Sequence, residues 1–175
     1  KDKKTTRGFH TLSIAAIERL TTDTVKVTFD VPSDLTNQFL VEAGQYVNCL
    51  IEINGREERR SYSICSGKNE ALSIAVKMIP AGKVSTWFNK EAAVGMSIQV
   101  SSPEGNFTLK AQEKNVVFIA AGSGITPILS LAKAIEERQG KAHLLYGNRT
   151  QASTIFAHEL PTLSSLKVTH FLSNE

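Results

Sequence analysis

The chain has 175 residues, of which 41% are hydrophobic and 21% are charged, and its formal net charge is +3. This length allows a buried core and two small domains, and the composition is that of a globular protein. Nucleic-acid binding is not expected, because the cations are scattered and the basic cluster at residues 1–4 is interpreted as a solvated tail. No apolar stretch is long enough to cross a bilayer and the chain opens without a signal-like segment, so we expect no membrane contact and a reduced, cytoplasmic setting.

The first hundred or so residues show the alternation that is typical of half-buried strands. Val25, Val27 and Phe29, for example, are separated by polar residues. Strands are expected at residues 25–29, 47–53, 59–65, 72–78 and 98–100. Asn54-Gly55 predicts a hairpin turn between the second and third of them, because both residues tolerate positive φ. Many short strands at regular spacing predict a small antiparallel barrel.

One segment interrupts this rhythm of strands. Pro80-Ala81-Gly82 turns the chain, and residues 84–88 then show the pattern of a short helix with hydroxyls in its first turn. We interpret this helix as a plug for the barrel.

The residues that most often bind metals show no ligand spacing. Cys49 and Cys65 lie far apart in apolar runs, where a small buried thiol is the simplest interpretation. The four histidines also lack the spacing of a metal site, so no metal bound by this chain is expected.

After a polar stretch at residues 110–115, interpreted as an interdomain linker, the pattern changes. Residues 116–120 are continuously apolar, as in a strand that is covered on both faces. Thr126 is expected to cap the following helix, Pro127 suits its first position, and Gly140 is expected to end it.

The last segments complete an alternating series. We expect a strand at residues 142–146, a short helix at residues 155–160 that Pro161 stops, and a third strand at residues 166–172. The resulting β-α-β-α-β order is half of a doubly wound nucleotide-binding domain, so the sheet looks unfinished and the chain looks like a piece of a longer protein.

Two short motifs suggest chemistry, although each alone has a structural alternative. Gly122-Ser123-Gly124 joins a strand to a helix, where free N–H groups and the helix dipole suit a pyrophosphate. Pro127 replaces the third glycine of the usual dinucleotide fingerprint, and a plain glycine turn is an equal alternative. Arg60-Ser61-Tyr62-Ser63 alone is compatible with ordinary strand packing.

Five motifs in a fixed order resemble the ferredoxin–NADP⁺ reductase superfamily. They are Arg60-Ser61-Tyr62-Ser63, Gly82-Lys83-Val84-Ser85, Pro103-Glu104-Gly105-Asn106-Phe107, Ala121–Pro127 and Tyr146-Gly147-Asn148-Arg149. Within the superfamily, residues 58–66, Phe9-His10 and residues 146–150 most resemble the reductase subunits of bacterial phenylacetyl-CoA epoxidases. The resemblance implies an all-β antiparallel flavin-binding barrel at residues 1–112 and a partial α/β nucleotide-binding domain of the doubly wound kind at residues 113–175.

The resemblance also implies roles for residues of the barrel. Arg60 would bind the FAD pyrophosphate, Tyr62 would lie against the flavin, and Ser63 would hydrogen-bond near flavin N5. Tyr62 and Ser63 are thus the candidate catalytic residues. The phosphates would be held at the start of the short helix, at Gly82, by the backbone N–H groups of Lys83 and Val84 and by the Ser85 hydroxyl. Ala81 stands where many relatives have glycine.

In the nucleotide-binding half, the resemblance places the NAD(P)H pyrophosphate and nicotinamide on four residues of the glycine loop and helix start. These are Gly122, Ser123, Gly124 and Thr126. Arg149 follows the second strand, where the adenosine ribose is held, and a cation there favours the 2′-phosphate of NADPH over NADH. A surface loop charge is the alternative interpretation of Arg149.

The implied function is a flavoprotein reductase that passes electrons from NADPH or NADH through FAD to an iron–sulfur acceptor. The cluster would lie on a missing ferredoxin-like domain or on a partner such as an oxygenase component, and the missing C-terminal part could leave the fragment inactive. Three alternatives stay open: a stand-alone flavin or quinone reductase, a non-catalytic flavin-binding docking module, and a structural domain without cofactor.

Overall fold

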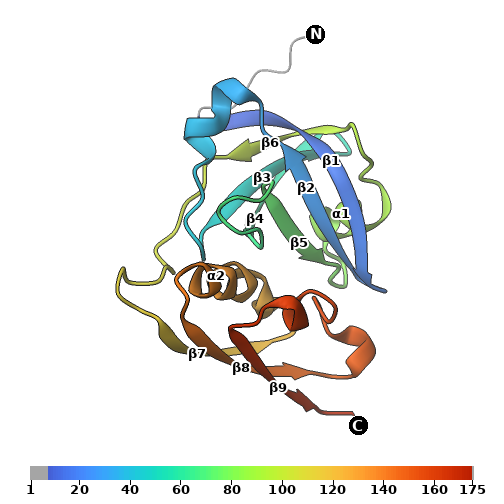
Figure 1. Ribbon diagram of the computed structural model, residues 1–175. Helices are drawn as coiled ribbons and strands as arrows, with labels where there is room; N and C mark the ends of the chain where they lie inside the picture. The colour runs from blue at the N-terminus through green and yellow to red at the C-terminus, as the bar shows by residue number, and fades with distance from the viewer. Residues whose placement is uncertain (1–7, 175) are drawn as a thin grey trace.

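A computed structural model describes residues 8–174, so the basic cluster at residues 1–4 lies outside the described part of the chain. The described residues form an antiparallel sheet followed by a smaller parallel sheet, with a helix packed on each (Figure 1). Within them, no helix has both the length and the hydropathy that a membrane crossing requires.

The antiparallel sheet has six strands in the spatial order β4-β3-β6-β1-β2-β5. Their bounds are β1 Phe9–Thr21, β2 Thr24–Asp30, β3 Tyr46–Ile53, β4 Arg56–Ser63, β5 Ser73–Lys77 and β6 Ser97–Ser101. A 3₁₀ helix, Ser33–Phe39, connects β2 toward β3. The predicted hairpin turn is present, since Asn54 and Gly55 have φ of 52° and 73° and join the paired residues Ile53 and Arg56.

This sheet curls around an apolar core. Alternation places Val25, Val27 and Phe29 inside, as expected, and the helix α1 (Lys83–Lys90) adds Val84 and Phe88 to the same core. Strands β4 and β5, at the two ends of this strand order, do not form a hydrogen-bonded ladder with each other. Just beyond β4, Ile64 forms an isolated bridge with Ile74 of β5. The predicted antiparallel fold and its plugging helix are thus confirmed, although no continuous ladder joins β4 to β5.

The parallel sheet has the strand order β7-β8-β9. Its strands are β7 Asn115–Ala121, β8 Lys141–Asn148 and β9 Leu166–Leu172, and the helix α2 spans Ile125–Glu137. The predicted alternation of strand, helix and strand is confirmed, and α2 lies between this sheet and the barrel (Figure 1).

Two local expectations for this half are wrong. The strand β7 is not covered on both faces, because Val117 and Ile119 are 65% and 77% exposed. The segment expected to form a second helix is instead a series of turns between the 3₁₀ helices Gln151–Ser153 and Leu160–Thr162. Pro161 lies inside the latter, and the run between Thr154 and Pro161 is too short to nucleate a helix on its own.

The ends of α2 also differ from the expectation. Thr126 lies inside the helix rather than at its cap, and its hydroxyl donates to the Ser123 carbonyl. The helix ends at Glu137, and Gln139 takes the left-handed conformation with φ of 55°. Gly140 donates its N–H to Ile135, which completes a Schellman-type end. Glycine is needed at 140 because a Cβ there would strike the Lys114 carbonyl oxygen.

The barrel and the parallel sheet share buried contacts through α2. Cys65 and Ala75 belong to the barrel sequence but pack in the core cluster of the parallel sheet. The Ser130 hydroxyl of α2 donates to the Ser66 carbonyl across the same contact. Apolar packing and a buried hydrogen bond therefore hold the two parts together.

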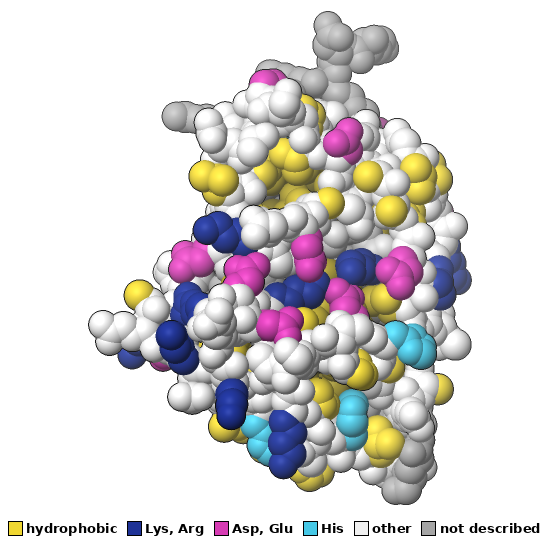
Figure 2. Space-filling model, in the orientation of Figure 1, with side chains coloured by type: hydrophobic (Ala, Val, Ile, Leu, Met, Phe, Trp, Pro, Cys, Tyr) yellow, Lys and Arg dark blue, Asp and Glu magenta, His cyan; other side chains and the backbone are white. Residues whose placement is uncertain are grey.

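A charged cluster borders this contact, and Figure 2 shows opposite charges alternating across the middle of that face. Lys133 of α2 is paired at 2.7 Å with both Glu70 and Glu159, and Lys26 of β2 lies 3.1 Å from Glu159. Although burial opposes it, hydrogen bonding to the two carboxylates raises the pKa of Lys133. The cluster therefore links residues of the barrel with residues of the parallel sheet by charge.

Candidate functional site

Strand β4 and helix α1 position the predicted flavin residues. Glu58, Arg60 and Tyr62 point to one face of β4, because successive side chains in a strand alternate. The Tyr62 ring packs edge-on against Phe88 of α1 with ring centroids 5.5 Å apart, and burial raises the pKa of Tyr62 above its usual value. The aromatic ring is thus fixed against α1.

Arg60, the predicted pyrophosphate ligand, and the Lys83 side chain are brought together by an acidic residue. Lys83 donates to one oxygen of the Glu58 carboxylate at 2.7 Å, and Arg60 donates to the other at 3.4 Å. Both cations remain exposed, with 57% and 52% of their side-chain surface accessible. The motifs at residues 60–63 and 82–85 therefore converge in space, although they are well separated in the sequence.

The start of α1 is a tight loop. Ala81 has φ of 57°, a conformation that favours glycine. The Ser85 hydroxyl donates to the Gly82 carbonyl and accepts from the Ile79 N–H. Its proton is therefore used within the loop, and direct phosphate binding by Ser85 stays a prediction. The backbone N–H groups at the helix start are the donors that suit an anion there.

Ser63 lies at the end of β4, where it pairs with Tyr46 of β3. Tyr46 also forms a β-bridge with Glu104, and a Cβ on Gly105 would come within 3.0 Å of the Tyr46 ring. The motif at residues 103–107 therefore lies beside β3, with Tyr46 between it and Ser63. Beneath it, the buried Asn48 amide donates to Glu104, which ties the loop to β3.

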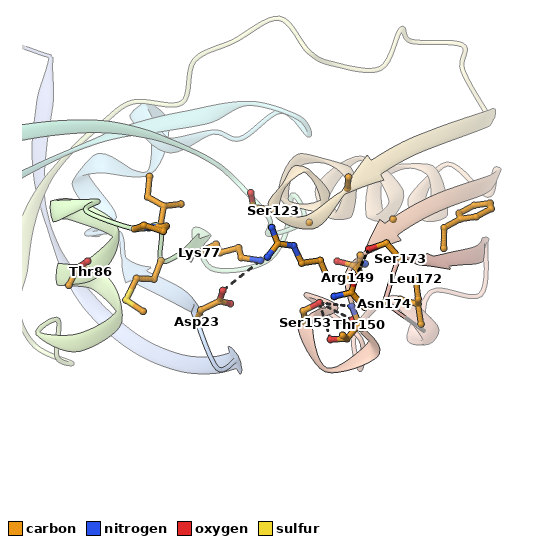
Figure 3. A pocket seen from close by; sticks show the side chains of 18 of the residues that line it. Asp23, Lys77, Thr86, Ser123, Arg149, Thr150, Ser153, Leu172, Ser173 and Asn174 are labelled. Carbon is orange, nitrogen blue, oxygen red and sulfur yellow. Dashed lines mark hydrogen bonds and ion pairs between the residues drawn. The ribbon is translucent and has the colours of Figure 1, made fainter.

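A cleft of about 1320 Å³ separates the barrel from the C-terminal ends of the parallel strands (Figure 3). Lys77 and residues 78–81 form one wall, and Gly122, Ser123 and Arg149 line the other. Arg60, Tyr62 and Ser63 are not among its lining residues. The loop before α1 therefore borders both the predicted FAD phosphate site and this cleft.

Lys77 is a cleft residue that the sequence reasoning missed. It lies 3.6 Å from Asp23, and in Figure 3 the Lys77 and Arg149 side chains point toward one another across the cleft. Although partial burial opposes it, the Thr21 hydrogen bond and the Lys77 charge lower the pKa of Asp23. The alternation of β5 shows only that Lys77 lies at a strand end, so no local signal could have placed it opposite Arg149.

The glycine loop has the properties of a phosphate site. Gly122 has φ of 49°, and its carbonyl accepts from the buried Tyr146 hydroxyl, whose pKa burial raises to about 12. Gly124 has φ of −62°, and a Cβ there would meet nothing within 4 Å. Neither backbone strain nor packing therefore requires glycine at 124, whereas the close approach of a ligand would.

Asn148 adds an unsatisfied donor at the same edge. Its buried Nδ2 makes no hydrogen bond within the described part of the chain, although its amide lies beside the Tyr146 hydroxyl. Asn148 and the neighbouring Arg149 and Thr150 line the cleft. A buried amide donor, a cation and open glycine N–H groups form the donor set that suits a nucleotide phosphate.

The sequence model of the oxidoreductase FAD-binding domain family matches residues 11–109, which is more than half of the chain. The chain belongs to the oxidoreductase FAD-binding domain family. A second family model, that of the oxidoreductase NAD-binding domain, matches residues 118–174. The predicted FAD-binding and nicotinamide-nucleotide-binding parts of an oxidoreductase are thereby confirmed, while the boundary between residues 112 and 113 stays a prediction.

Named relatives of this FAD-binding family member include components of oxygenase systems. The chain is 37% identical over 161 residues to one subunit of the 1,2-phenylacetyl-CoA epoxidase of Escherichia coli strain K12, covering 89% of this chain and 45% of that protein. It is 34% identical over 172 residues to the ferredoxin reductase component of 3-ketosteroid-9-alpha-monooxygenase of Rhodococcus rhodochrous, covering 93% and 49%. The chain thus spans less than half the length of both relatives.

A solved structure agrees with this membership. The structure of phthalate dioxygenase reductase, described as a modular structure for electron transfer from pyridine nucleotides to [2Fe–2S], matches with a TM-score of 0.79 and 30% identity. The match covers 93% of this chain and 52% of that one. The antiparallel and parallel sheets of the chain are therefore arranged relative to each other as in phthalate dioxygenase reductase.

The two cysteines have no part in this site. Cys49 and Cys65 are fully buried, as expected, and burial raises the pKa of the Cys65 thiol to about 12. Among residues 8–174, no group of three or more His, Cys, Asp or Glu side chains is arranged to hold a metal ion.

Proposed function

We propose that the chain is the flavin- and nucleotide-binding part of a reductase that serves a multicomponent oxygenase of the phenylacetyl-CoA epoxidase type. The observation that carries the proposal is the loop at residues 78–82, which borders both the convergent Arg60–Lys83 site and the cleft beside the glycine loop. Two anion-binding regions that share one loop suit two nucleotide cofactors whose reactive rings must meet. The similarity to one of the epoxidase's subunits supports the oxygenase class.

The residues of the barrel would hold the flavin. Arg60, Lys83 and the N–H groups at the start of α1 would bind the pyrophosphate of FAD, since charge-assisted contacts to phosphate are strong. Tyr62, fixed by Phe88, would pack against the flavin, and Ser63 would donate a hydrogen bond near N5. When bound, the flavin would accept hydride and release single electrons, while the protein would position the flavin and set the charges around it.

The residues of the cleft would hold the nicotinamide nucleotide. Gly122, Ser123 and Gly124 would bind its pyrophosphate, and Arg149 together with Lys77 would attract a 2′-phosphate. This arrangement favours NADPH over NADH. Electrons would leave through a ferredoxin-like domain or an oxygenase component, which the relatives' names support as the partner class.

The first experiment is a visible spectrum of the chain after incubation with FAD and desalting, followed by NADPH without oxygen. We expect a retained flavin spectrum, and bleaching by NADPH that exceeds bleaching by NADH. Arg60→Ala should release the flavin, whereas Arg56→Ala, an exposed change on the same strand, should not. Loss of flavin from the unmodified chain would contradict the assignment of the barrel.

A second measurement tests the electron-transfer role. With FAD bound, the protein should reduce an added [2Fe–2S] ferredoxin at the expense of NADPH. Flavin that stays bound but never bleaches when NADPH is added would instead support a non-catalytic docking module. Fast reduction of free flavin or quinone with no reduction of the ferredoxin would support the stand-alone reductase.

A further inference from the structure

The carboxylate of Glu58 occupies the space between the two cations that the proposed function gives to phosphate. Only 17% of its side-chain surface is exposed, whereas more than half of each cation is. One carboxylate oxygen accepts from Lys83 and the other from Arg60. An acidic group therefore fills the centre of a site whose remaining groups suit an anion.

The surroundings of Glu58 favour a negative charge at this point. Lys83 is the first residue of α1, where the helix dipole is positive and the first N–H groups lack helical partners. The hydrogen bond from Lys83, with the charges of Lys83 and Arg60, holds the pKa of Glu58 below its usual value. Glu58 thus makes the contacts that a phosphate oxygen would make there.

Arg60 is also held along its own strand. One guanidinium nitrogen donates to the Arg59 carbonyl at 2.6 Å while the other contacts Glu58. A guanidinium that binds a pyrophosphate in a bidentate manner needs two of its N–H groups on one edge. In this arrangement, Arg60 would have to give up at least the contact with Glu58 before it could bind a phosphate with that edge.

We propose that Glu58 is an internal competitor for the flavin pyrophosphate: its carboxylate pairs with Arg60 and Lys83 and is displaced from them when the pyrophosphate binds. The inference rests on the proposed function, since it takes these cations to be the pyrophosphate ligands. It extends that function by naming a residue that lowers the affinity for FAD. Glu58 keeps two exposed cations paired without ligand and makes the flavin exchangeable.

The test is a titration of the flavin-free chain with FAD, followed by quenching of flavin fluorescence. Glu58→Gln keeps the size of the side chain and removes the charge. Since each exposed ion pair is weak, the variant should bind FAD roughly three- to tenfold more tightly. Glu57→Gln is the matched control, because it removes the same charge from the neighbouring residue on the opposite face of β4 and should change the affinity little.

Two further probes locate the effect at the phosphates. Glu58→Gln should strengthen binding of ADP, measured by calorimetry, in proportion to its effect on FAD. Riboflavin, which has no phosphate, should bind both proteins equally. A gain for riboflavin as large as that for FAD would overturn the proposal, because the effect would then lie at the ring.

The remaining outcomes are also decisive. Unchanged or weaker FAD binding by Glu58→Gln, with Arg60→Ala still weakening it, would show that Glu58 does not compete although the flavin site is correct. Absence of FAD binding by the unmodified chain and by every variant would instead refute the proposed function, and the competitor with it.

Discussion

The two sheets of the molecule differ in how their apolar faces are covered. The antiparallel sheet curls, so that its inner residues contact one another and helix α1, and Val27 and Val47 are fully buried. The parallel sheet carries α2 on one face, while Val117 and Ile119 on the other face are mostly exposed. A curled sheet can bury one face within itself, whereas a flat one needs a layer of other residues on each side.

The difference in cover should decide how strongly a substitution in each sheet affects stability. The predicted flavin residues stand on the barrel, whose core is enclosed by its own strands and α1. The predicted nucleotide residues stand at the strand ends of a sheet with one open face. We therefore expect changes in the barrel core to affect the whole molecule, and changes on the open face to affect it least.

The largest contrast is expected from the same substitution in the two sheets. Val27→Ala removes two buried methyl groups from the barrel core and should lower the free energy of unfolding by about 2–3 kcal/mol. Val117→Ala removes the same atoms from a site that is 65% exposed, and the change should stay within about 0.5 kcal/mol. Urea unfolding of both variants measures the difference, and equal losses would contradict the assignment of burial.

The next largest effect is expected where the two parts meet. Lys133→Met leaves Glu70 and Glu159 without their shared cation, and the Lys133 side chain is only 9% exposed. We expect the free energy of unfolding to fall by about 1–2 kcal/mol; the fall is no larger because both carboxylates are partly exposed to water. Lys167→Met, at an exposed position of β9, is the control for the charge change. Equal melting temperatures of the two variants would show that the cluster does not stabilise the contact.

The same cluster predicts a pH dependence. Although burial opposes it, hydrogen bonds from Lys133 and the Gly67 N–H lower the pKa of Glu70 below its ordinary 4.5. Its contribution to stability is therefore present above pH 4.5 and is lost as the pH falls through the lower folded-state value. Lys133 has a raised pKa, so its contribution is present below 10.5 and is lost as the pH rises through the higher folded-state value. Below pH 4.5, the melting temperature of Glu70→Gln should fall less steeply with pH than that of the unmodified chain.

A smaller effect, on binding alone, is expected in the cleft. Arg149→Ala should weaken NADPH binding roughly tenfold and NADH binding much less, because the lost contact is to a 2′-phosphate. Lys77→Ala should act in the same direction, by less, because Asp23 already partly neutralises its charge. Calorimetry with both nucleotides separates these effects. Equal losses for NADPH and NADH would place Arg149 away from the 2′-phosphate.

The sequence predicted those features that depend on neighbours along the chain. Alternation of Val25, Val27 and Phe29 indicates a strand, and Asn54-Gly55 indicates a hairpin, because side-chain direction and φ preference are local properties. The order of the five motifs indicated the family, whereas the meeting of the Arg60 and Lys83 side chains at Glu58 is a finding of the structure.

Features that depend on contacts between distant residues could not be predicted in this way. Lys133 is one of several polar residues on a helical pattern, and its burial arises from Glu70 and Glu159, which lie elsewhere in the sequence. The exposure of Ile119 is likewise decided by what packs on β7, since an apolar run is the same in a covered and an uncovered strand. Glu58 was part of a quoted motif, yet only the position of α1 shows that it pairs with both Arg60 and Lys83.

The smallest effect on folding, and the sharpest test of the open face, is expected from a change on β7. Val117→Thr together with Ile119→Thr keeps β-branched side chains and removes apolar surface, so the unfolding free energy should change by less than about 0.5 kcal/mol. Exposed apolar patches promote association, and Phe171 of β9 adds to the exposed apolar residues of this sheet. Sedimentation velocity should therefore show less self-association for the double variant than for the unmodified chain. A destabilised double variant would mean instead that other residues cover this face in solution, and the contrast between the two sheets would then disappear.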